Sequence, residues 1–89
     1  MIGIITDSIE RAYDEWVRQH AETFVVASYS GRSKSGEKFR IFRCVGSLHA
    51  ETLRGYEFSS LVIIGKPNKK STEVARTLVR QSETKAHVS

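Results

Sequence analysis

The chain has 89 residues, of which 39% are hydrophobic and 27% are charged, as in a small folded domain and unlike a disordered segment. Its formal charge is +4, but residues 1–30 hold two basic and five acidic residues (net −3), whereas residues 31–89 hold twelve and five (net +7). The only cysteine, Cys44, excludes an internal disulfide and favours a cytoplasmic protein. The acidic start is unlike a signal peptide, and no apolar run approaches the ~20 residues of a membrane span, so we expect no membrane contact.

A strand and a helix are predicted first along the chain. Residues 1–6 form an apolar run that predicts a short buried strand. Asp7 and Glu10 follow with the spacing of a capping box, in which both side chains satisfy the first amides of a helix. Apolar residues then recur at helical spacing as far as about residue 20 and predict one buried stripe, made of Ile9, Ala12, Tyr13, Trp16 and Val17.

The middle of the chain predicts a hairpin. Residues 23–29 are rich in β-branched and aromatic side chains, as are residues 38–45, and both segments predict strands. The segment 31–38 between them holds two glycines and two serines, so we expect a loop that joins an antiparallel pair. One helical turn is predicted at residues 49–54, ended by Gly55.

The last third predicts another strand and another helix. Residues 60–65 are apolar on both faces, which is typical of a strand inside a covered sheet, and residues 72–81 show a helical stripe. The polar residues 83–89 are expected to form a tail, which leaves residues 1–82 as a single domain. The order β-α-β-β-(α)-β-α predicts a small layered α/β sheet with mixed parallel and antiparallel strands.

The segment GKPNKKST, residues 65–72, contains the ingredients of a phosphate-binding loop. Such a loop has the pattern GxxxxGK[ST], but Lys69 stands here where the second glycine belongs, and Pro67 removes a backbone amide. We therefore expect an ordinary strand–turn–helix connection in which Ser71 or Thr72 caps the helix.

Catalytic and metal-binding patterns are weak. The three histidines do not stand at metal-ligand spacing, and Cys44 precedes His49 by five residues, which matches no zinc signature, so we expect no metal and no cofactor. A small hydrolase or nuclease that uses Asp7 and Glu10 is the third and least favoured functional alternative. General acid–base catalysis needs positioned partners, and a capping role explains Asp7 and Glu10 more simply.

Basic residues gather after the last predicted strand and favour contact with a polyanion. Lysines lie in the loop, and arginines four residues apart follow on the polar side of the last helix. The predicted nucleic-acid contacts are Lys66, Lys69, Lys70, Arg76, Arg80 and Arg54.

Residues 47–65, SLHAETLRGYEFSSLVIIG, are similar to a stretch of viral DNA-packaging large terminases, in which a leucine-arginine-glycine turn precedes a strand that ends in an acidic magnesium-binding pair. Part of the segment also resembles a motif of superfamily-one helicases. Both families are nucleic-acid motors with an ATPase core. This sequence has Gly65 and Lys66 in place of the acidic pair, so the resemblance implies a scaffold without ATP hydrolysis, as in a small phage or mobile-element accessory protein.

These patterns lead to two main hypotheses about function. The first is a non-catalytic module that binds nucleic acid, or a nucleic-acid enzyme, through the basic residues above. The alternative is a homo-oligomeric interaction protein that inhibits or adapts a host protein, because four strands that are apolar on both faces exceed what two helices cover in so short a chain.

Overall fold

A computed structural model describes the chain from Met1 to Val88, with side chains described as far as Gln81. It contains a five-stranded sheet in the order β2-β3-β4-β1-β5. The central strand β1 is parallel to both of its neighbours, β4 and β5, whereas β3 runs antiparallel to β2 and β4. The predicted α/β class with a mixed sheet is therefore confirmed. The strands are β1 (Ile2–Thr6), β2 (Ala21–Val25), β3 (Ser30–Ser33), β4 (Lys38–Arg43) and β5 (Ser60–Ile64).

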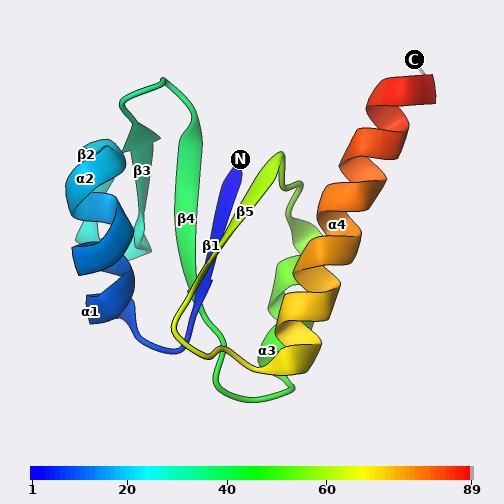
Figure 1. The fold of residues 1–89 in the computed structure, drawn as a ribbon, viewed down its shortest axis with the longest axis horizontal. Helices are drawn as coiled ribbons and strands as arrows, with labels where there is room; N and C mark the ends of the chain where they lie inside the picture. The colour runs from blue at the N-terminus through cyan, green and yellow to red at the C-terminus, as the bar shows by residue number, and fades with distance from the viewer. Residues whose placement is uncertain (89) are drawn as a thin grey trace.

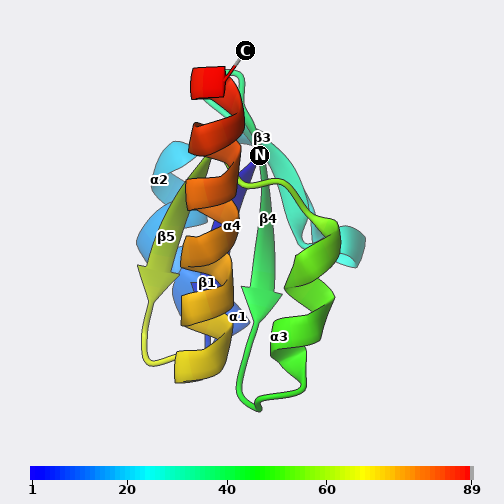
Figure 2. The same cartoon turned by 90° about the vertical axis from the view of Figure 1, so that its right-hand side faces the viewer.

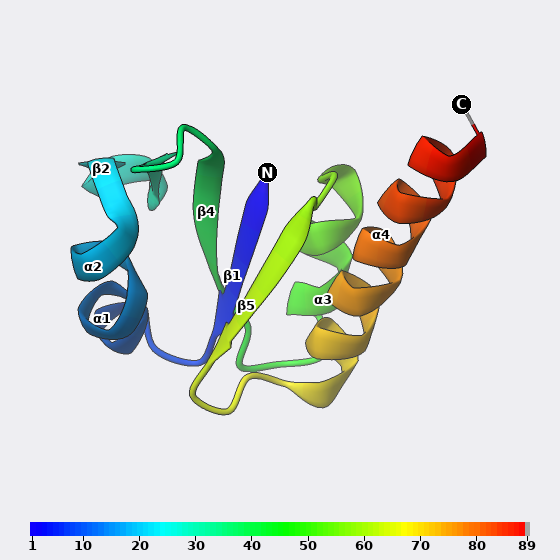
Figure 3. The ribbon, with the colours of Figure 1, turned by 45° about the horizontal axis from the view of Figure 1, so that its top comes forward.

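Helices cover both faces of the parallel part of the sheet (Figure 1 and Figure 3). On one face the chain forms a continuous helical segment made of α1 (Ile9–Ala12), the π-helical turn η1 (Tyr13–Val17) and α2 (Arg18–His20). The other face carries α3 (His49–Thr52), which continues as the 3₁₀ turn η3 (Leu53–Gly55), and the long helix α4 (Lys69–Val88). In Figure 2, α3 and α4 lie side by side in front of the sheet.

The core consists of two apolar clusters, one on each face of the sheet. Ile4 and Phe39 pack with Val17 under the first helical segment, and Ile5 and Phe42 pack on the opposite face, under α3 and α4. All five residues of β1 are buried because this strand has a neighbour on each side and helices on both faces. The alternation predicted for β4, with Phe39 on one face and Phe42 on the other, is thus confirmed.

The predicted hairpin is wrong in its pairing. The strand β2 ends at Val25, and a 3₁₀ turn, η2 (Val26–Ser28), reverses the chain into β3. This strand begins one residue before the predicted loop and occupies its first three residues. This extra strand separates β2 from β4. It is short and polar, so it has none of the alternation that reveals a strand, and a side chain at Gly31 would collide with the backbone of Thr23 on β2.

Other predicted boundaries also need correction. Ser8, not Asp7, caps the first helix, because its hydroxyl accepts a hydrogen bond from the Arg11 amide at 3.4 Å. The strand β5 was expected inside the sheet but forms its edge, and Ile63 is 39% exposed. Helix α4 begins at Lys69 and extends through Val88, into the segment predicted as a tail, because neither glycine nor proline interrupts residues 69–88.

Candidate functional site

Three loops meet at the carboxyl ends of the parallel strands, the edge where open α/β sheets bind their ligands. The chain leaves β1 toward one face of the sheet and leaves β4 and β5 toward the other. Backbone hydrogen bonds connect the loops: the Cys44 amide donates to Thr6 at 2.7 Å, and the Asn68 amide donates to Cys44 at 2.8 Å. The basic segment after β5 is therefore fixed to the centre of the sheet.

Asn68 caps helix α4 and decides what its amino terminus can bind. The Asn68 side-chain oxygen accepts hydrogen bonds from the amides of Lys70 and Ser71, at 3.0 and 3.4 Å. The predicted cap at Ser71 or Thr72 is wrong, because Ser71 is fully buried and the Thr72 hydroxyl donates to the Asn68 carbonyl. Since the chain's own asparagine occupies these two amides, the helix terminus does not offer them to a phosphate.

Gly65 and Asp7 face each other across the ends of β5 and β1. Gly65 has a φ of +74°, and a side chain there would collide with the Asp7 carboxylate, next to the Arg11 guanidinium. One carboxylate oxygen of Asp7 is buried and has no hydrogen-bond partner among the residues that the structure describes. Glu10, the other half of the suggested acid pair, lines a different cavity, which Asp7 does not line. The structure thus gives the two carboxylates different surroundings.

Cys44 is buried beside Ser71 beneath these loops. Burial raises the pKa of the Cys44 thiol above its ordinary value, and the nearby Ser71 hydroxyl opposes this rise only in part. The thiol therefore stays protonated at neutral pH. His49 cannot act as its base through Nδ1, because that nitrogen accepts hydrogen bonds from the Val45 and Gly46 amides, at 3.1 and 3.2 Å.

The predicted basic residues divide into two groups. Lys69, Arg76 and Arg80 stand at positions i, i+7 and i+11 of α4, so they share one exposed face of the helix, and Lys66 and Lys70 are exposed at its start. Arg54 lies on η3 and pairs with Glu51 at 3.1 Å. The structure therefore places five of the six residues on α4 or the loop before it, and Arg54 on another element. We call those five, Lys66, Lys69, Lys70, Arg76 and Arg80, the basic face.

A groove between α4 and the edge strand β5 borders the basic face. Its volume is about 430 Å³, and Arg76 and Arg80 line it together with the apolar side chains of Leu61, Ile63 and Val79. This apolar border was not predicted from the sequence, because the apolar run of β5 indicated a strand in the interior of the sheet. The cap at Asn68 was not predicted either, although an asparagine just before the first helical residue is a common cap signal.

Other site types find no support in the described part of the chain. Among residues 1–81, whose side chains the structure describes, no cluster of three or more side chains is suited to hold a metal ion. None of the helices described there is long and apolar enough to cross a membrane. Comparisons with protein-family models, with curated proteins and with solved structures find no match for this chain. The resemblance to terminases and helicases therefore stays a prediction.

Proposed function

We propose that this protein is a binding module that holds the sugar-phosphate backbone of a nucleic acid on its basic face. The observation that carries the proposal is the alignment of Lys69, Arg76 and Arg80 along one exposed side of α4. From the helical rise of 1.5 Å, this row is about 17 Å long, equal to about five steps of a nucleic-acid strand.

Three of the six arginines outside the basic face form ion pairs, which contrasts with the basic face. Arg11, Arg18 and Arg54 each pair with a carboxylate three or four residues away on the same helical segment. Arg76 and the three lysines of the basic face have no carboxylate partner among the described residues. Their charges remain available to an external anion.

The geometry favours contacts that depend on charge rather than on base sequence. Asn68 occupies the amides that could grip a single phosphate, so the lysine and arginine side chains carry the interaction. Such binding releases counterions and weakens steeply as the salt concentration rises.

Fluorescence anisotropy with labelled single-stranded and duplex DNA over a series of salt concentrations tests the proposal. We expect the double variant Lys69→Gln/Arg76→Gln to bind more weakly and to lower the slope of log K against log[salt] by about 1.4 for single strands or about 1.8 for duplex. The matched control Lys34→Gln/Lys38→Gln removes the same charge from exposed positions away from α4 and should change the slope by much less. Equal losses in both variants, or no binding at low salt, would exclude this function.

A further inference from the structure

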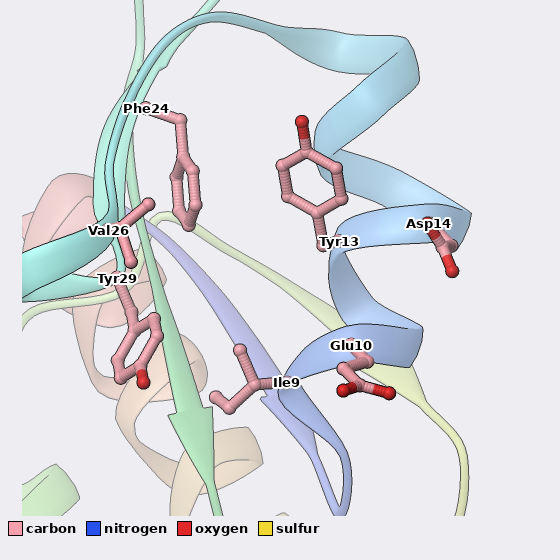
Figure 4. Close-up of a pocket in the computed structure, with 7 residues that line it drawn as sticks. All are labelled: Ile9, Glu10, Tyr13, Asp14, Phe24, Val26 and Tyr29. Atoms are coloured by element: carbon pink, nitrogen blue, oxygen red, sulfur yellow. The ribbon is translucent and has the colours of Figure 1, made fainter.

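A second cavity lies between the first helical segment and the β2–β3 hairpin, on the opposite side of the sheet from α4 (Figure 4). Its volume is about 550 Å³, which is within the range of small-molecule sites. None of its residues belongs to the basic face. The lining residues are Ile9, Glu10, Tyr13, Asp14, Phe24, Val26 and Tyr29.

Three aromatic rings form the walls of this cavity. Tyr13 and Phe24 face each other from η1 and β2, with ring centroids 5.6 Å apart and ring planes at 51° (Figure 4). Tyr29 stands below them, opposite Ile9. Tyr13 is 40% exposed and Tyr29 is 41% exposed, so both rings keep free surface for a ligand.

Unusual backbone geometry holds two of these rings in place. Tyr13 begins the π-helical turn η1, a rare element that is frequent at functional sites. Tyr29 has a φ of +48°, in the left-handed region that bulky residues seldom adopt, and its carbonyl accepts a hydrogen bond from the Ile41 amide at 2.8 Å. Asparagine and glycine adopt that conformation more readily than tyrosine, so the presence of tyrosine at this position indicates a role for its ring.

The charge around the cavity is negative. Glu10 lies at its edge beside Ile9 and pairs with no basic side chain in the described part of the chain. Asp14 is directed away from the rings and pairs with Arg18 at 3.4 Å. The Arg18 guanidinium carbon lies 6.0 Å from the centroid of the Tyr13 ring, so a cation of the chain itself already contacts this aromatic surface.

We propose that the cavity binds an organic cation with an alkylammonium head group. The electron-rich faces of Tyr13, Phe24 and Tyr29 would surround the methyl groups, and the Glu10 carboxylate would face the positive charge. A neutral apolar ligand would desolvate Glu10 without compensation, and an anion would meet a chain segment with a net charge of −3. The chemistry thus selects a large, weakly hydrated cation.

Calorimetric titration of the intact chain tests the proposal with choline and with 3,3-dimethylbutan-1-ol, the neutral carbon analogue of choline. We expect choline to bind at least about tenfold more tightly, because only the cation gains the cation–π attraction. The same titration with a peptide that carries one trimethyllysine shows whether the cavity prefers a cation on a protein side chain to a free small molecule. Equal affinity for choline and its analogue, or no binding of either cation, would overturn the proposal.

Substitutions then assign the binding to this cavity. Tyr29→Asn removes a ring but suits the left-handed backbone, so we expect an unchanged unfolding temperature and about tenfold weaker choline binding. Glu10→Gln should weaken choline about threefold, whereas Glu22→Gln, an equal charge change at an exposed position of β2 outside the cavity, should have no effect. Full affinity in Tyr29→Asn would contradict the assignment.

Discussion

Gly65 is restricted both by its backbone conformation and by a neighbouring side chain. Its positive φ disfavours any side chain, and the Asp7 carboxylate occupies the space that a β-carbon would need. Gly36 also has a positive φ, of +90°, but the space around it is open. A comparison of substitutions at the two glycines therefore distinguishes the effect of backbone strain from the effect of steric collision.

We expect Gly65→Ala to lower the free energy of unfolding by about 2–4 kcal/mol, and Gly36→Ala by about 1 kcal/mol, because only the first adds a collision to the strained φ. Urea denaturation measures both values. Combining Gly65→Ala with Asp7→Ala should recover part of the loss, since the colliding carboxylate is then absent. Equal destabilisation by the two glycine substitutions would show that Asp7 does not restrict this position.

At the scale of elements, the amino terminus of α4 depends on one cap. The sequence pattern favoured Ser71 or Thr72, but the structure assigns the cap to Asn68 and buries Ser71 with an unpaired hydroxyl. Loss of the cap acceptor at Asn68 should therefore lower the stability, whereas loss of the buried Ser71 hydroxyl should not.

Thermal and urea unfolding of three variants test this assignment. Asn68→Ala should lower the free energy of unfolding by about 1 kcal/mol, since the amides of Lys70 and Ser71 lose their acceptor. Ser71→Ala should be neutral or slightly stabilising, because it removes a buried polar atom that has no partner. Asn68→Asp keeps the acceptor and should retain the stability of the native chain. A larger loss from Ser71→Ala than from Asn68→Ala would restore the serine as the cap.

Periodicity predicted the elements that carry an apolar stripe and failed for those that do not. The repeat from Ile9 to Val17 predicted the first helical segment, and the alternation in β4 predicted its two faces. The short strand β3, SGRS, has no such pattern because its residues are small or polar, although it pairs with the strands just before and just after it in the chain. The exposure of β5 was missed for a different reason: an apolar run does not reveal whether it lies at the centre or at the edge of a sheet.

At the scale of the whole molecule, the sheet separates the two proposed sites. The helical segment that carries Glu10 and Asp14 covers one face, and α4 with the basic face covers the other (Figure 1). The sequence predicted the basic residues by their charge but not the aromatic cavity, because its rings come from segments that only the folded chain brings together. The uneven charge along the chain thus corresponds to an acidic helical segment on one face of the sheet and a basic helix on the other.

The two sites should act independently, because they share no residue and a packed sheet lies between them. Substitutions at distant sites without common partners are usually additive, and at 0.15 M salt exposed charges are screened within about 8 Å. We therefore expect Tyr29→Asn to leave the DNA affinity and its salt slope unchanged. Lys69→Gln/Arg76→Gln should change the choline affinity by less than about twofold, which is below the usual range of allosteric coupling.

Anisotropy titrations of DNA with and without saturating choline measure the coupling between the two sites directly. If choline strengthens or weakens DNA binding, DNA must change choline binding by the same factor, and the sheet would then transmit a conformational change between its two faces.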